Sequence, residues 1–110
     1  MVLGSQALIA TGQASKVSDR LQSWVVDHPH DAAAWRLLAQ AWKEQQQPLR
    51  SVRAEAEAYV AHYDYPAAVD RFKAAQDLAR RGEGDHIDAS IIDTRLRAVE
   101  ALLREQAREQ

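Results

Sequence analysis

Apolar side chains recur at helical spacing along most of this chain, and this repeat limits its fold more than any other feature. Between residues 32 and 45, Trp35, Leu38, Ala39 and Trp42 fall at positions i, i+3, i+4 and i+7. This spacing places all four on one face of an α-helix. No alternation of apolar and polar residues lasts for more than a few positions, so nothing favours β-strands. The pattern predicts an all-α chain.

Prolines and glycines mark the ends of the predicted helices. The three prolines and four glycines fall mostly between the periodic segments, where such residues interrupt helices. Asp31 and Asp64 each precede a periodic segment and predict N-caps, because their carboxylates can accept hydrogen bonds from free backbone N–H groups. The sequence therefore predicts six helices, at about 2–10, 14–27, 32–45, 48–62, 65–80 and 86–108.

The last predicted helix carries two adjacent apolar stripes, which together form a face wide enough to pack against two neighbours. Pairs of opposite charge four residues apart also predict ion pairs along this helix. The first stripe contains Ile87, Ile91, Ala98 and Leu102, the second contains Ile92, Leu96, Val99 and Leu103, and the pairs are Asp93 with Arg97 and Glu100 with Arg104.

Composition excludes several classes of function. The 110 residues carry a net charge of −2, so there is no basic excess for binding nucleic acid through its phosphates. The absence of cysteine excludes disulfides and thiolate zinc sites. No segment approaches the roughly 20 apolar residues of a membrane-spanning helix, and no signal peptide is predicted. The residues alone indicate either a cytoplasmic protein or a piece of a longer one.

The segment Asp27-His28-Pro29-His30-Asp31 contains two histidines and two aspartates, which are residue types that bind zinc. However, two histidines so close together in a proline-containing turn do not converge on one ion without a further ligand, and Asp31 already has a role as an N-cap. The four histidines of the chain include no HExxH pair. We therefore predict a turn between helices, with no metal, no cofactor and no catalytic residues in this chain.

The aromatic residues have both a structural and a functional interpretation. Trp24, Trp35 and Trp42 could stack on a ligand, but aromatic residues at helical spacing usually pack in the core. We therefore predict core packing for all three. The segment containing Tyr59, Tyr63 and Tyr65 could transfer protons, but no nucleophile stands nearby in the sequence, so a packed turn between helices is predicted.

The spacing of the turns indicates a helical repeat. Pro29 occupies the position of the proline that closes a tetratricopeptide unit, and Trp35 follows at the position of the next unit's first aromatic. A second register, half a repeat away, matches Tyr65 and Phe72. We predict a single domain over residues 1–110 with a tetratricopeptide-like α–α superhelix of stacked hairpins, approximate units 1–30, 31–64 and 65–108, and a long C-terminal capping helix.

A candidate binding groove follows from this repeat, since the first helices of such hairpins line a concave surface that binds peptides or partner helices. Arg36, Gln40 and Lys43 share one face of the helix predicted at 32–45, beside its apolar stripe. They could hold a carboxylate or backbone amides of a partner. The alternative interpretation is an ordinary solvated face.

Three segments in succession resemble one known family: DHPHDAAAWRLLAQAW, RAEAEAYVAHYDYPAAVDRFKAAQDLAR and DASIIDTRLRAVEALLRE. They resemble the C-terminal tetratricopeptide region of BepA-like periplasmic zinc metalloproteases of Gram-negative bacteria. The similarity covers about residues 5–105. The chain departs from the family at His62-Tyr63, where the family usually has a glycine before Asp-Tyr.

The resemblance implies that this chain is the non-catalytic domain of a Zn-dependent protease, excised from a longer periplasmic protein whose zinc lies in a separate catalytic domain. It implies protein or peptide partners: outer-membrane assembly components, clients in outer-membrane quality control, or the protease domain itself. The alternative is a free-standing cytoplasmic tetratricopeptide adaptor or assembly chaperone.

Overall fold

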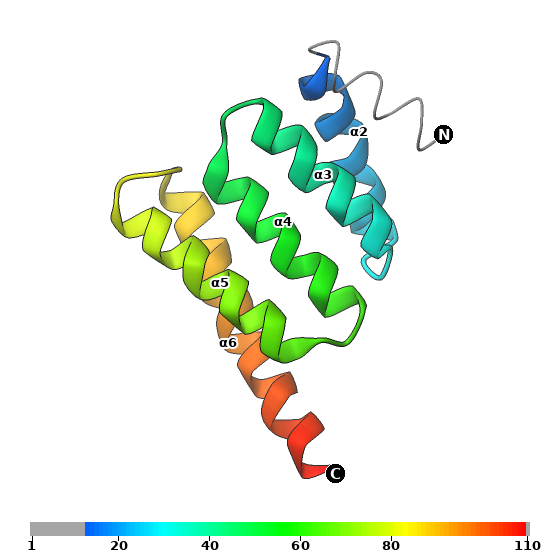
Figure 1. The fold of residues 1–110 in the computed structure, drawn as a ribbon, viewed down its shortest axis with the longest axis vertical. Coiled ribbons are helices and arrows are strands. Elements are labelled where there is room, and N and C mark those ends of the chain that lie inside the picture. The colour runs from blue at the N-terminus through cyan, green and yellow to red at the C-terminus, as the bar shows by residue number, and fades with distance from the viewer. Residues whose placement is uncertain (1–12, 110) are drawn as a thin grey trace.

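The computed structural model describes residues 13–109 of the chain, and within this range it contains five helices and no strand (Figure 1). The all-α prediction is therefore confirmed. None of these five helices is long and apolar enough to cross a membrane. The helix predicted at about 2–10 lies outside the described residues. The five helices are α2 (Ala14–Asp27), α3 (Ala32–Glu44), α4 (Pro48–Ala61), α5 (Tyr65–Arg80) and α6 (His86–Arg108).

Both predicted N-caps are confirmed. The Asp31 carboxylate accepts a hydrogen bond from the backbone N–H of Ala34 at 3.0 Å, and the Asp64 carboxylate accepts one from Ala67 at 3.3 Å. Each cap satisfies one of the N–H groups that the first turn of a helix leaves without a partner. Pro48 begins α4, a position where proline's missing N–H costs nothing. Local sequence signals therefore fix where these helices start.

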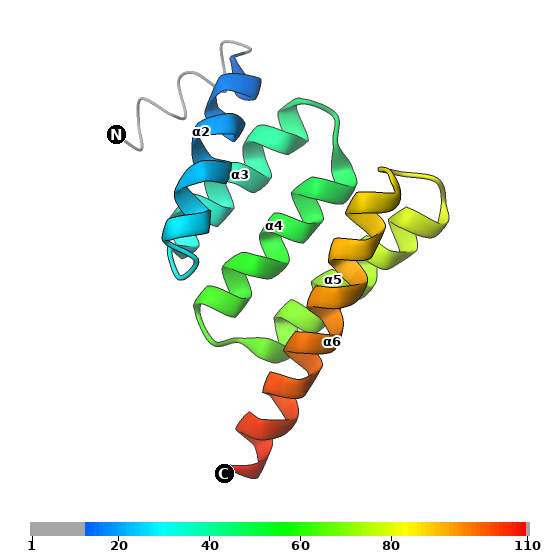
Figure 2. The same ribbon diagram turned by 180° about the vertical axis from the view of Figure 1, so that it is seen from behind.

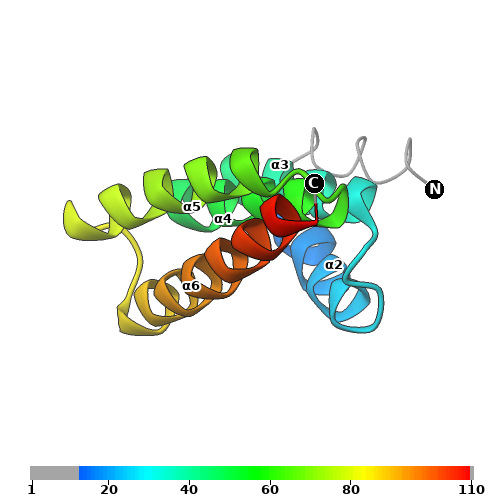
Figure 3. The same cartoon turned by 90° about the horizontal axis from the view of Figure 1, so that it is seen from below.

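Three helices form one layer, and the other two lie on one side of it. Figure 3 shows α3, α4 and α5 side by side, with α2 and α6 below them, and Figure 2 shows α2 and α6 from the side that they cover. Each helix packs against the next one in the chain. α4 also contacts α6, but among the described residues α2 does not contact α4 and α3 does not contact α5.

The largest part of the core lies between α3 and α4. Leu38 and Trp42 of α3 are almost completely buried, and they pack with Ala54, Ala58 and Ala61 of α4. Alanines on α4 allow the large side chains of α3 to fill the space between the helices at native packing density. A second cluster lies between α4, α5 and α6, where Phe72 is fully buried.

The prediction that all three tryptophans pack in the core is wrong for Trp24. Trp35 and Trp42 are buried, but Trp24 is 48% exposed. Its indole N–H donates to the Asp31 carboxylate at 2.8 Å, and its ring stacks on His28 with 3.8 Å between the ring centroids. Trp24 lies in the last turn of α2. The hydrogen bond to Asp31 keeps its indole N–H at the surface of the protein.

The prediction that α6 packs against two neighbours is confirmed, but these neighbours do not cover the whole of its predicted apolar face. Ile92, Leu96 and Val99 of the second stripe are buried, whereas Ile87 and Leu102 of the first stripe are 70% and 37% exposed. α6 contacts α4 and α5, but both lie against the same side of it. One stripe is therefore sufficient to hold the helix in place.

Candidate functional site

A surface groove lies between α3 and α4. It encloses about 850 Å³ and contains the three residues that the sequence analysis selected, Arg36, Gln40 and Lys43, all of which are exposed. The remaining lining residues come from both helices and from the turns that follow α3 and α5. They are Ala39, Glu44, Gln46, Pro48, Ser51, Val52, Glu55 and Glu83.

Small residues make the floor of the groove. The Ser51 hydroxyl donates to the backbone carbonyl of Ala39 at 2.7 Å, which holds α4 close to α3. Ala39 and Ser51 are short and buried, whereas the longer side chains of Arg36 and Glu55 are exposed. Val52 adds an apolar side chain to the lining. The groove is therefore lined by apolar residues together with polar and charged ones.

The two cations of the groove are not neutralised by ion pairs. None of the salt bridges among residues 13–109 includes Arg36 or Lys43. Three carboxylates, those of Glu44, Glu55 and Glu83, also line the groove. Its charge is therefore mixed, which suits a polar polypeptide better than a strongly charged polymer.

The histidine-containing turn between α2 and α3 is held by both neighbouring tryptophans. The Trp35 indole N–H donates to the carbonyl of Pro29 at 3.0 Å. The Trp24 hydrogen bond, followed by the bond from the Ala34 N–H, lowers the pKa of the Asp31 carboxyl below its ordinary value. Within the described range, no three histidine, aspartate or glutamate side chains form a group suited to a metal ion.

Two tyrosines, Tyr63 and Tyr65, contact each other at the turn between α4 and α5. Tyr63 has a positive φ of 62°, a backbone conformation that glycine adopts more readily than other residues. Its ring stacks against His30 with 5.9 Å between centroids and meets Tyr65 edge-on. The Gln106 side chain donates to the Tyr63 carbonyl at 3.1 Å, so this turn also positions the end of α6.

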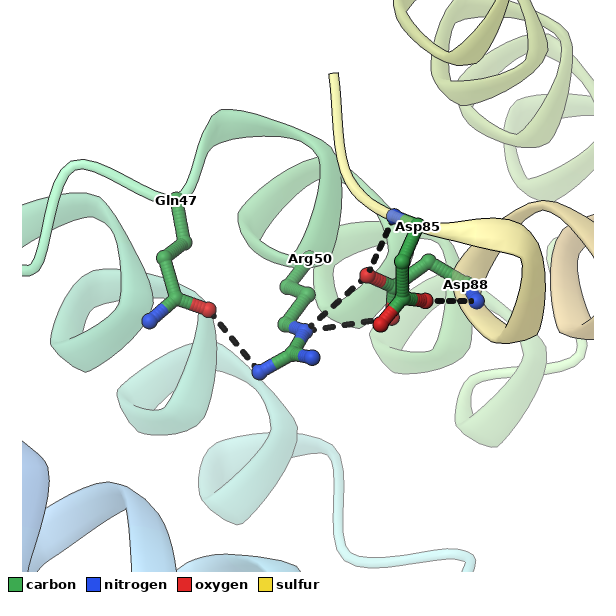
Figure 4. Close-up of polar contacts among 4 residues, drawn as sticks. All are labelled: Gln47, Arg50, Asp85 and Asp88. Atoms are coloured by element: carbon green, nitrogen blue, oxygen red, sulfur yellow. Dashed lines mark hydrogen bonds and ion pairs between the residues drawn. The ribbon is translucent and has the colours of Figure 1, made fainter. Parts of the chain in front are cut away.

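A set of charged residues between α4 and α6 forms ion pairs that were not predicted from the sequence. Arg95 of α6 binds Glu57 of α4 through two hydrogen bonds of 2.7 and 2.8 Å. Arg50 of α4 binds Asp88 of α6 at 3.1 Å (Figure 4). The side chains of Glu57 and Asp88 are only 8% and 7% exposed, so both carboxylates are buried in these contacts. We call these four residues the charged seam.

The sequence does contain a signal for the charged seam. The two pairs have the same separation of 38 residues, because α4 and α6 run parallel with a constant offset. On α4, a cation is followed seven residues later by an anion; on α6, the order of the signs is reversed. Opposite charge orders at two-turn spacing on two helices would have indicated the pairing.

The pairs predicted four residues apart on α6 do not form. Among residues 13–109, no salt bridge joins Asp93 to Arg97 or Glu100 to Arg104. Asp93 instead accepts a hydrogen bond from the Gln76 side chain of α5 at 2.9 Å. Contacts between helices therefore replace the local pairs.

The start of α6 is fixed by a capping box. The Asp85 carboxylate accepts from the Asp88 N–H at 2.9 Å, and the Asp88 carboxylate accepts from the Asp85 N–H at 3.3 Å (Figure 4). The bond from the Asp88 N–H is the main cause that lowers the pKa of the Asp85 carboxyl. Gly84 precedes this box with φ 72°, and a Cβ there would lie 3.0 Å from the Asp88 carboxylate. Asp88 thus links the helix cap to the charged seam.

Comparison of this chain with protein-family models, with curated proteins and with solved structures finds no match.

Proposed function

We propose that this protein is a helical interaction domain that binds an extended polypeptide segment in the groove between α3 and α4. One observation carries the proposal: Arg36 and Lys43, two cations that form no ion pair with any residue between 13 and 109, lie with Gln40 along an open groove of about 850 Å³.

An extended peptide is the ligand that fits this chemistry best. It presents backbone N–H and C=O groups, which the Gln40 amide can pair as donor and acceptor. Its side chains alternate between two directions, so one set can contact Ala39, Pro48 and Val52 while the other meets the charged walls. A carboxylate on the peptide would pair with Arg36 or Lys43.

We further propose a more specific identity, a tetratricopeptide-like array that serves a BepA-like periplasmic metalloprotease. The resemblance of the three sequence segments supports it, together with helix boundaries that match the predicted hairpins at 31–64 and 65–108. In a regular stack, alternate helices pack on each other; among the five described helices, α4 and α6 are the one such pair. In this role the domain would recruit envelope proteins to a zinc active site in another domain.

The specific identity is tested by the native reading frame upstream of Met1. An HExxH domain and a signal peptide encoded there would support the protease assignment. A stop codon directly upstream would contradict it and favour the alternative, a free-standing adaptor or assembly chaperone. The groove itself would be unaffected by either result.

Selection from a random peptide library tests the binding function directly. The full chain is immobilised, and enriched peptides are measured against wild type and against the double variant Arg36→Ala, Lys43→Ala. Lys73→Ala is the matched control, since Lys73 is an exposed cation on α5 away from the groove. We expect micromolar binding, weakened about tenfold or more by the double variant and unchanged by the control. Enriched peptides that bind the double variant as well as wild type would contradict the proposal.

A further inference from the structure

Arg53 is a partly buried cation that forms no ion pair with the other residues of the described range 13–109. It lies on α4 between Arg50 and Glu57, at spacings of three and four residues, so the three side chains share one side of the helix. Its Nε is buried and has no hydrogen-bond partner among the described residues. Such a group is normally satisfied by a partner, because burying an unpaired polar group is costly.

The guanidinium of Arg53 packs over the ring of Trp42. Its central carbon lies 5.2 Å from the centroid of the Trp42 ring, within the range of a cation–π contact. Trp42 is only 2% exposed and belongs to the core between α3 and α4. Arg53 is therefore positioned by contact with a core residue.

The charges around Arg53 do not balance. Three guanidinium groups, of Arg50, Arg53 and Arg95, meet two carboxylates, of Asp88 and Glu57. Both carboxylates are already bound by Arg50 and Arg95. Burial is the main cause that lowers the pKa of Arg53 below its ordinary value, although arginine remains charged in proteins. One positive charge is thus left over at a partly buried position over the Trp42 ring.

We propose that Arg53 anchors a carboxylate-binding site on the side of α4 that faces α6, and that this site takes an acidic side chain or the C-terminal carboxylate of a partner polypeptide. A singly charged carboxylate matches the single excess positive charge and the planar fork of the guanidinium. A phosphate dianion fits less well, because the neighbouring carboxylates of Asp88 and Glu57 would repel its second charge.

This site is separate from the groove described above. The groove residues Val52 and Glu55 lie on the opposite side of α4 from Arg50 and Glu57, as the helical repeat of 3.6 residues requires. The inference therefore does not rest on the proposed function. Variants of Arg36 and Lys43 probe one side of α4, and variants of Arg53 probe the other.

Nuclear magnetic resonance of the ¹⁵N-labelled full chain tests the proposal. Three blocked tripeptides serve as probes: acetyl-Ala-Glu-Ala-amide, its glutamine counterpart, and acetyl-Ala-Ala-Ala with a free C-terminus. The signals to follow are the Arg53 Nε–H and the indole N–H of Trp42 beneath it. We expect saturable shifts with one or both carboxylate peptides and none with the glutamine peptide. The peptide that binds identifies the source of the carboxylate.

Variants decide whether Arg53 itself is responsible. Arg53→Met removes the charge at similar length, and Arg53→Lys retains the charge but loses the fork; the Trp42 signal reports binding in both. We expect the dissociation constant to rise about tenfold or more in Arg53→Met and to rise less in Arg53→Lys, with no change in Arg36→Ala, Lys43→Ala. Equal shifts with the glutamine peptide, no saturable shift, or full binding by a folded Arg53→Met or Arg53→Lys chain would each overturn the proposal.

Discussion

The sides of α4 that face α3 and α6 are built in different ways. Towards α3, the helix presents Ala54, Ala58 and Ala61 to large apolar side chains, which are buried. Towards α6, it presents Arg50, Arg53 and Glu57, and the contact depends on ion pairs. One helix therefore carries an apolar interface and a charged interface side by side.

This difference shows which contacts hold the fold together and which ones fix its geometry. Apolar burial is favourable in many registers, since it depends mainly on area. A pair such as Glu57 and Arg95, with two hydrogen bonds, is favourable in only one register. We infer that the α3–α4 interface supplies most of the stability, and that the charged seam sets how α6 lies on α4.

The largest expected effect comes from the apolar interface. Trp42→Ala removes a ring that is 2% exposed, and we expect a loss of about 3–5 kcal/mol in the free energy of unfolding. Trp24→Ala is the matched control, because Trp24 is 48% exposed; its expected loss is about 1 kcal/mol or less. Urea denaturation measures both. Equal losses would show that burial does not separate the two tryptophans.

The charged seam should give the next largest effect. A double-mutant cycle with Glu57→Ala and Arg95→Ala should return a coupling energy of about 1–3 kcal/mol. The same cycle on Asp77 and Arg81, an ion pair of 2.8 Å whose side chains are 50% and 71% exposed, should return about 0.5 kcal/mol or less. A coupling energy between Glu57 and Arg95 as small as that of the exposed pair would contradict the proposed role of the charged seam in placing α6.

The turn that leads into the apolar interface should give a smaller effect that depends on pH. Asp31→Ala removes the N-cap of α3 and should cost about 1 kcal/mol at neutral pH, whereas Asp31→Asn, which can still cap, should cost less. Since folding lowers the pKa of Asp31 below 3.8, its stabilisation is complete above that pH and is lost as the pH falls through the folded-state value. Urea denaturation between pH 2 and 7 should therefore show the wild-type advantage over Asp31→Ala shrinking only at the acidic end. A stability difference between wild type and Asp31→Ala that stays constant down to pH 2 would contradict a lowered pKa of Asp31 in the folded state.

The smallest expected effect is at the turn that links the α3-facing part of α4 to α5. Tyr63 has φ 62°, a conformation that costs non-glycine residues about 1 kcal/mol or more. Both Tyr63→Gly and Tyr63→Ala lose the contact with His30, but only glycine relieves the backbone. We expect Tyr63→Gly to be more stable than Tyr63→Ala by about 1 kcal/mol in thermal unfolding. The reverse order would show that the backbone of this turn is not strained.

The sequence was sufficient to predict the helices between residues 13 and 109 and the buried face of α3. Helix boundaries depend on local signals such as Asp31, Asp64 and Pro48, and these can be read without knowing the fold. The apolar stripe of α3 likewise predicted which of its residues are buried, including Trp35 and Trp42. The face shared by Arg36, Gln40 and Lys43 also follows from helical spacing alone.

Contacts between distant helices could not be predicted in the same way. The exposure of Trp24, and that of Ile87 and Leu102 on α6, depends on how many neighbours cover each helix. The charged seam joins residues 38 positions apart, and Arg53 acquires its environment only when α3, α4 and α6 come together. Local pairing rules instead favoured Asp93 with Arg97, a pair that the contact with α5 replaces.

The central claim, that the groove between α3 and α4 binds an extended peptide, is tested most directly by mapping the binding site on the ¹⁵N-labelled full chain. Titration with a peptide selected on wild type should shift backbone amide signals around Arg36, Gln40 and Lys43 on α3 and around Ser51 and Glu55 on α4, with little change in α2 and the second half of α6. Shifts concentrated in α2, α5 or α6, with the signals of the groove unchanged, would contradict the account.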